Sequence, residues 1–252
     1  MKPVGFVVFG CLTVPKYRQQ IEDAYATWVI DALAADCIVR FYTGEIPADL
    51  DPKIARLCTD VTFGDSYFSA TYNQWCGLED MLKVQDATEF VFVCGTDTFI
   101  NVENLIKYLK HHQYEFPAVF GSGEIKGMVD GKLYTYFSGG AGIVLNHLAL
   151  KTIVPELLDF IEWWLLVTGT YAEYKDASGN TVTQMLLFAC DCALCILCER
   201  LGILSVNISE SKMYGGGTHN SECIDFPNMI SCHNMLHDDF YDCYRRIHAS
   251  TF

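Results

Sequence analysis

A nearly continuous apolar run at 89–97, EFVFVCGTD, constrains the fold more than any other segment. Apolar residues at successive positions are typical of a central strand in a parallel sheet, which is buried on both faces. The run stops at Gly95, Thr96 and Asp97, so small and polar residues follow the strand directly. Open α/β sheets bind ligands at the carboxyl ends of such strands. The segment therefore predicts an α/β fold with a site beside Asp97.

Short β-branched runs alternate with helical patterns through the first half of the chain. Strands are expected at 5–10 and 37–44, and helices at 16–34, 68–84 and 102–112, with Asn101 capping the last helix. This order predicts a mostly parallel central sheet flanked by helices. No repeat and no linker-like composition divides the 252 residues, so we expect a single domain at 1–252.

The charge balance limits the partners of the chain. Seventeen Lys and Arg against thirty-one Asp and Glu give a formal net charge of -14, which disfavours nucleic acid and anionic membrane surfaces. A nucleotide ligand remains compatible with this charge if a cation screens its phosphates. The apolar stretch at 153–167 carries Glu156, Asp159 and Glu162 at helical spacing, which indicates an amphipathic helix and no membrane span.

Twelve cysteines leave two interpretations open. Cys190, Cys192, Cys195 and Cys198 fall in a helical pattern in which Cys195 and Cys198 form a C-x-x-C pair, whereas zinc sites usually repeat such pairs at a distance. Buried free thiols that act as small hydrophobes are one interpretation, and a cysteine-rich zinc or redox protein is the other.

Three blocks, in order along the chain, resemble the family 31 β-1,3-glycosyltransferases of the fringe and core 1 galactosyltransferase kind. FVFVCGTDTFINVENLIKYL (90–109) is similar to the metal-binding motif of that family, although Asp97 is the last and only acid kept of three. YFSGGAGIVLNHLAL (136–150) resembles the glycine loop of the family. CDCALCILCERLGILSV (190–206) resembles its catalytic motif, with Asp191 kept and Cys190 in place of the preceding acid.

The resemblance implies a GT-A type fold with a nucleotide-binding half at 1–112 and an acceptor and catalytic half at 113–252. It also implies metal-dependent, inverting β-1,3 transfer of a hexose or N-acetylhexosamine from a UDP-sugar to a hydroxyl of a glycan or glycoconjugate. Asp191 would be the general base. Asp97 and His233, which ends the strand-like segment MISCHNM (229–235), would hold Mn²⁺ or another divalent cation.

The same resemblance suggests donor-binding residues in four segments. They are Thr13 and Arg18 in 12–28, Asp65 and Tyr67 in 64–75, Thr96 and Asp97 after the apolar run, and Gly139 and Gly140 in the glycine loop. Glycines would let the backbone approach the sugar and diphosphate and donate hydrogen bonds from its N–H groups. The lysine of the family falls on Asn73, so one positive contact is missing.

Plainer structural roles stay open for the same residues. Asp97 fits a turn, the glycines fit a tight connection, Asp191 fits a helix start and a lone histidine is often structural. The missing acids at Gly95, Thr96 and Cys190 also suit a catalytically impaired, sugar-binding relative. Without a recognisable signal or anchor we expect a cytoplasmic protein, or a secretory lumenal one if the chain is trimmed from a longer protein.

Overall fold

The computed structural model describes residues 3–61, 70–84, 88–168, 170–175, 181–186, 190–215 and 224–249. A central sheet contains seven strands in the order β12-β6-β9-β4-β1-β2-β3. They are β1 (Val4–Phe9), β2 (Ile38–Thr43), β3 (Cys58–Asp60), β4 (Phe90–Gly95), β6 (Ala118–Gly121), β9 (Ile143–Asn146) and β12 (Leu204–Asn207). β9 runs antiparallel to β4 and β6, and the other neighbours are parallel. The expected mostly parallel sheet is confirmed.

The apolar run that predicted a central strand forms β4, whose residues face two hydrophobic cores in alternation. Phe90, Phe92 and Cys94 belong to one core, and Val91 and Val93 belong to the other. All five are at most 2% exposed. Successive side chains of a strand point to opposite faces, so an unbroken apolar run is what a sheet covered on both sides requires.

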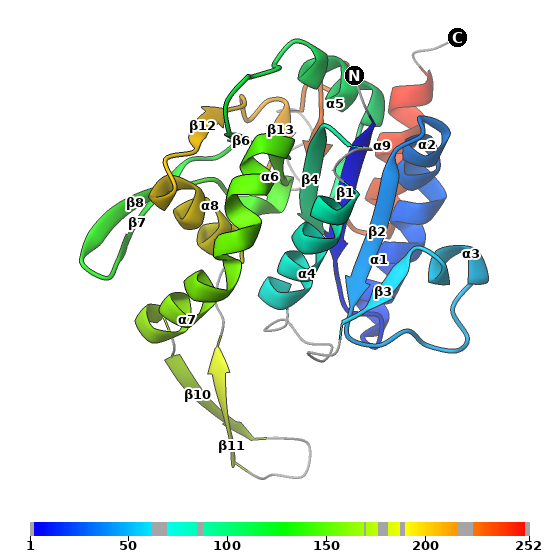
Figure 1. The fold of residues 1–252 in the computed structure, drawn as a ribbon. Coiled ribbons are helices and arrows are strands. Elements are labelled where there is room, and N and C mark those ends of the chain that lie inside the picture. Colours follow the sequence, from blue (N-terminus) through cyan, green and yellow to red (C-terminus); the bar gives the residue numbers. More distant parts are fainter. Residues whose placement is uncertain are drawn as a thin grey trace.

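Helices cover both faces of the sheet (Figure 1). One face packs against α1 (Pro15–Ala24), a π-helical turn (Tyr25–Val29), α2 (Ile30–Ala34), the short α3 (Pro52–Ala55), α5 (Val102–Lys110) and α9 (His237–Ala249). The other packs against α4 (Ala70–Lys83), α6 (His147–Ile153), a 3₁₀ turn (Val154–Glu156), α7 (Leu157–Thr168) and α8 (Cys190–Arg200). The expected cap of α5 is confirmed, because Asn101 Oδ1 accepts a hydrogen bond from the Asn104 N–H at 3.1 Å.

A small sheet places part of the C-terminal region beside the segment that follows β4. It contains β5 (Phe99–Ile100), β13 (Met213–Tyr214) and β14 (Ser231–Cys232), in the order β13-β14-β5. β14 pairs with β5 through Cys232 and Phe99. Two hairpins complete the described structure, β7 (Ile125–Val129) with β8 (Lys132–Tyr136), and β10 (Thr170–Lys175) with β11 (Thr181–Leu186).

None of the eleven described cysteines forms a disulfide. Cys192, Cys195 and Cys198 lie on the buried part of α8, where burial raises the pKa of the Cys195 thiol to about 12. In the described ranges no group of three or more His, Cys, Asp or Glu side chains could hold a metal ion. The burial of Cys192, Cys195 and Cys198 within α8 is consistent with thiols that pack as small hydrophobes. Each described helix is too short or too polar to cross a membrane.

Candidate active site

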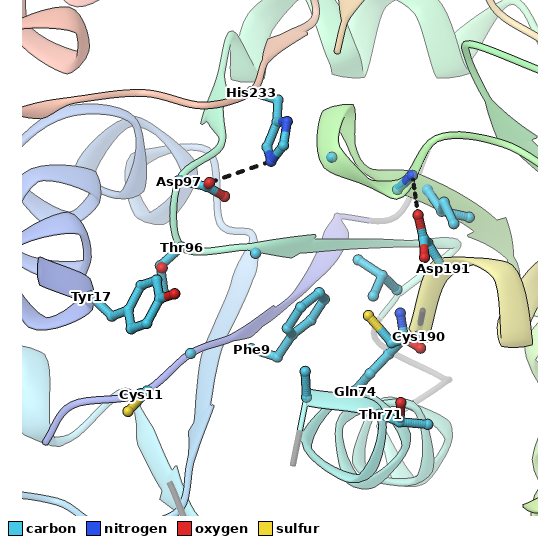
Figure 2. A pocket seen from close by; sticks show the side chains of 17 residues that line it. Phe9, Cys11, Tyr17, Thr71, Gln74, Thr96, Asp97, Cys190, Asp191 and His233 are labelled. Carbon is cyan, nitrogen blue, oxygen red and sulfur yellow. Dashed lines mark hydrogen bonds and ion pairs between the residues drawn. The ribbon is translucent and has the colours of Figure 1, made fainter. Parts of the chain in front are cut away.

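A cavity of about 280 Å³ opens at the carboxyl edge of the central sheet. The ends of β1 and β4 form its floor, and the glycine turn at Gly139–Ala141, the start of α8 and the segment after β14 form its walls (Figure 2). β9 contributes to the same edge because it runs antiparallel to β4 with Ile143 opposite Val93, so the turn before β9 lies beside the end of β4. The topology therefore brings together segments that are far apart in the sequence.

Asp97 and His233 face each other across one end of this cavity (Figure 2). Nε2 of His233 lies 3.3 Å from Oδ2 of Asp97. Both side chains are about one-quarter exposed, so each can be reached from the cavity. The two residues that the resemblance assigns to a metal are thus neighbours, although they are 136 positions apart in the sequence. The pairing of β14 with β5 brings them together.

The ring orientation of His233 suits a ligand of a cation. Nδ1 lies 3.2 Å from the carbonyl oxygen of Gly215, which can only accept, so Nδ1 carries the proton and donates it. In the neutral ring the lone pair then lies on Nε2, the atom that faces Asp97. Burial lowers the pKa of His233, but the hydrogen bond and charge of Asp97 outweigh it and raise the pKa above its usual value. The Asp97 carboxylate therefore stabilises positive charge on the His233 ring.

Asp191 lies at the first turn of α8, on the opposite wall of the cavity. Its Oδ2 accepts a hydrogen bond from the Gly139 N–H at 2.9 Å, and its Oδ1 accepts one from the Cys192 N–H at 2.9 Å. Each oxygen keeps further lone-pair capacity, because a carboxylate oxygen can accept more than one hydrogen bond. Asp191 is therefore held in place at a helix start and can still accept a proton from a ligand.

Gly139 and Gly140 are required by protein side chains on both sides of the cavity. A Cβ at position 139 would overlap the side chain of Asp191, with Cγ at 2.9 Å, and a Cβ at position 140 would overlap the ring of His233, with Cγ at 2.7 Å. The Gly139 N–H is already bonded to Asp191. The glycines thus allow the backbone to approach the two site residues closely, a reason that differs from the expected direct approach to a ligand.

Thr96 lines the cavity, and its hydroxyl is bonded within the protein. Thr96 Oγ1 donates to Gln20 Oε1 at 2.9 Å, and Gln20 Nε2 donates to the Met235 carbonyl at 3.4 Å. Both side chains are 4% exposed. This chain of bonds connects the end of β4 to α1 and to the segment that carries His233.

Thr13 and Arg18, two other suggested donor contacts, do not line the described part of the cavity. Thr13 is exposed in the turn before α1. Arg18 forms ion pairs with Glu22 at 3.1 Å and Asp49 at 3.0 Å. Neither is among the described residues that line the cavity. Asp65 and Tyr67 lie outside the described residues, and their role stays a prediction.

Comparison with known proteins finds a shared fold and no close relative. The chain matches no protein family model and no curated protein sequence. It is similar to the crystal structure of a glycosyltransferase involved in the glycosylation of the major capsid of PBCV-1, with a TM-score of 0.51, 10% identity, and coverage of 95% of this chain and 98% of that chain. The fold is of the GT-A type.

Two other similar structures were found at lower scores. One is 4-diphosphocytidyl-2C-methyl-D-erythritol synthase from Anaerococcus prevotii, with a TM-score of 0.44, 11% identity, and coverage of 82% of this chain and 87% of that chain. The other, from Desulfovibrio desulfuricans G20, is assigned as a nucleotide-diphospho-sugar transferase, with a TM-score of 0.42, 13% identity, and coverage of 99% and 96%. Identities this low show at most a common fold, so activity has to be argued from the side chains in the cavity.

Among the described residues that line the cavity, Tyr17 and Gln74 were not expected from the sequence, whereas Thr71 lies in the segment 64–75 that resembles a motif of the family. Tyr17 reaches the cavity near Thr96, and Thr71 and Gln74 reach it from α4 (Figure 2). A signal for the last two exists in the sequence, because they occupy the face of α4 that continues as Leu78. The two polar residues interrupt an otherwise apolar helix face, which is the feature that sets this end of α4 apart in the sequence.

Proposed function

We propose that the protein is a metal-assisted glycosyltransferase that moves a hexosyl or N-acetylhexosaminyl group from a UDP-sugar to a hydroxyl of a glycan or glycoconjugate. The observation that carries this proposal is the presence of the Asp97 and His233 pair and the Asp191 carboxylate on opposite walls of one cavity. Sugar transfer from a diphosphate needs a cation to neutralise the leaving group and a base to take the proton of the acceptor. Asp97 and His233 suit the cation, and Asp191 is the separate proton acceptor.

Asp97 and His233 fit Mn²⁺, which accepts both carboxylate oxygen and imidazole nitrogen. These two side chains would hold the ion, which takes oxygen ligands as well as imidazole nitrogen. When bound, the ion would neutralise negative charge on the diphosphate, in a chain whose own net charge is -14. The Gly215 carbonyl favours the proton on Nδ1, so that in the neutral ring the lone pair lies on Nε2, beside Asp97.

Asp191 removes the proton of the acceptor hydroxyl in this proposal. The hydroxyl oxygen then attacks the anomeric carbon from the face opposite the leaving UDP, which inverts the configuration. The Gly139 and Cys192 N–H groups hold the carboxylate so that it meets the acceptor without reorganising. The β-1,3 linkage and the likeness to fringe and core 1 galactosyltransferases rest on the ordered sequence blocks at 90–109, 136–150 and 190–206.

The test is a screen of UDP-sugars for UDP release in Mn²⁺ and in EDTA, with and without mixed glycan acceptors. We expect release from at least one UDP-sugar in Mn²⁺, stimulated by acceptor and lost in EDTA. Direct binding of Mn²⁺ and UDP, measured by calorimetry, gives a second readout that needs no turnover. A protein that binds UDP-sugar but releases no UDP with any acceptor would overturn the catalytic proposal.

A sugar-binding relative without catalysis is the second candidate. Gly95, Thr96 and Cys190 stand where the family has acids, and the Thr96 hydroxyl already donates to Gln20. Binding of a UDP-sugar without release of UDP is the result that this candidate predicts.

A further inference from the structure

The cavity has a second end, between α4 and the start of α8. Thr71 and Gln74 border it from α4, and Cys190 and Asp191 border it from α8 (Figure 2). In Figure 2 the Gln74 side chain extends from α4 toward Cys190, on the side of the cavity away from Asp97. This end of the cavity is thus built by elements that do not carry the candidate metal ligands.

Two buried acceptor atoms at this end lack partners. Thr71 and Gln74 are each 1% exposed. Within the described part of the chain, neither Thr71 Oγ1 nor Gln74 Oε1 has a hydrogen-bond partner. Buried polar atoms are nearly always hydrogen-bonded, so these two, on residues that line the cavity, lack a partner that the described chain does not supply. Two such atoms one helical turn apart, at i and i+3, lie on the same side of α4.

The surroundings define the chemistry of that partner. Phe9, Val93 and Ile143 supply apolar surface to the cavity. Among the described residues that line it there is no Lys or Arg, and Asp191 contributes a carboxylate. An anionic ligand group would meet no opposite charge here and would be repelled by Asp191. Apolar walls with a few placed hydrogen-bonding groups suit a ligand that is neutral and rich in hydroxyls.

We infer that Thr71 and Gln74 bind the sugar of the donor and that this sugar is uncharged. The inference rests on the proposed function, in which Asp97 and His233 fix the diphosphate at the other end of the cavity. Gln74 Oε1 accepts a hydrogen bond from a sugar hydroxyl, and Thr71 Oγ1 either accepts or donates one. Asp191, on the same side of the cavity, then lies close to the anomeric carbon. The two α4 residues are specificity-determining contacts to the sugar.

Calorimetric titration of three proteins tests the inference: the parent, Thr71→Val and Gln74→Met. Each substitution keeps the approximate shape and removes the polar atom. The probes are UDP and the UDP derivatives of glucose, galactose, N-acetylglucosamine, N-acetylgalactosamine and glucuronic acid, all in Mn²⁺. We expect one or more neutral UDP-sugars to bind the parent more tightly than UDP. Each variant should bind that UDP-sugar about 5- to 100-fold more weakly, with UDP affinity within about twofold. UDP-glucuronic acid should bind no more tightly than UDP.

The thermal stability of the ligand-free proteins gives an independent readout, with Thr98→Val as the matched control. Thr98 is also buried, at 0% exposure, but its Oγ1 donates to the Gly140 carbonyl at 2.9 Å. Removing a hydrogen bond that is made should lower the Tm of Thr98→Val by about 2–4 °C. Removing an unpaired polar atom should leave the Tm of Thr71→Val and Gln74→Met unchanged or raised, because no bond is lost.

The outcomes separate this inference from the proposed function. A parent protein that does not bind UDP in Mn²⁺ overturns both. If the parent binds a UDP-sugar and both variants bind it equally well, only the sugar contact is wrong. Equal weakening of UDP and UDP-sugar would place the nucleotide, not the sugar, against α4 and also overturn the inference. A lowered Tm in both variants, comparable with that of Thr98→Val, would show that the two side chains are structural.

Discussion

Nε2 of His233 lies 3.3 Å from Oδ2 of Asp97, and backbone hydrogen bonds on both sides of His233 set that distance. The His233 N–H donates to the Tyr214 carbonyl at 2.9 Å, and the Met235 N–H donates to the Asp97 carbonyl at 3.0 Å. The geometry of the pair is thus fixed by the main chain. Substitution of either side chain should leave this framework intact, so effects on ligand binding can be separated from effects on folding.

Asp97→Ala and His233→Ala should each weaken Mn²⁺ binding by at least about 100-fold, since loss of an indirect partner of a metal ligand already costs up to about that much. UDP affinity in Mn²⁺ should fall with it, because the ion would bridge the protein and the diphosphate. Calorimetry with Mn²⁺ alone and then with UDP measures both. His248→Ala is the matched control, because its Nε2 lies 3.1 Å from Asp31 Oδ2 on the α2 and α9 side of the fold. If both site variants bound Mn²⁺ as tightly as the parent, the assignment of Asp97 and His233 as metal ligands would be wrong.

Gly140→Ala should displace the His233 ring, because the new Cβ would lie 2.7 Å from its Cγ. We expect a loss of stability of about 1–3 kcal/mol in urea unfolding, as for other overpacked sites, together with weaker Mn²⁺ binding. In a His233→Ala background the ring is gone, so Gly140→Ala should lower the free energy of unfolding much less. This double-mutant cycle isolates the contact. If Gly140→Ala lowered the stability equally in both backgrounds, position 140 would need glycine for another reason.

Asp191→Asn should lower the transfer rate by about 10²–10⁴, the range typical of a lost general base. One of its two hydrogen bonds from backbone N–H groups would be lost with the amide, so a cost of about 1 kcal/mol in stability is also expected. Mn²⁺ and UDP affinities should stay near those of the parent. Rates of UDP release and calorimetry measure the two effects separately.

The matched control for that variant is Asp130→Asn, in the turn of the β7 and β8 hairpin. Asp130 has a φ of 49°, a conformation that Asn also adopts readily. The control removes the same charge and should leave the rate unchanged. If Asp191→Asn kept the parent rate and only lost stability, Asp191 would be a structural carboxylate at the start of α8.

Buried thiols should make the protein less stable at high pH. Burial raises the pKa of Cys195 to about 12 from its usual value of 9.0. Between these values the unfolded thiol loses its proton and the folded thiol keeps it, so the free energy of unfolding falls as pH rises from about 9 to about 12. The slope for one thiol is up to about 1.4 kcal/mol per pH unit. Urea unfolding at several pH values should give Cys195→Ala a shallower decline than the parent, and parallel declines would contradict the buried, protonated thiol.

The sequence by itself determined the elements whose cause is local. The unbroken apolar run at 90–94 requires burial on both faces, and the structure places it as β4 between β1 and β9. Asn101 caps α5 because its side chain reaches an N–H group only three residues away. The start of α8 at Cys190 and Asp191 follows from the same kind of short-range pattern. Such signals depend only on residues a few positions apart, so they can be recognised in the sequence itself.

Only the tertiary structure decided what those elements bring together. The need for glycine at 139 and 140 comes from Asp191 and His233, whose side chains occupy the space that a Cβ would take. Gln20 holds Thr96 through a bond between α1 and the end of β4 that no spacing in the sequence foretells. The unpaired atoms of Thr71 and Gln74 become meaningful only once α4 is packed beside the cavity. These contacts depend on the register of strands and the docking of helices, which are set by the packing of the whole chain and not by any local segment.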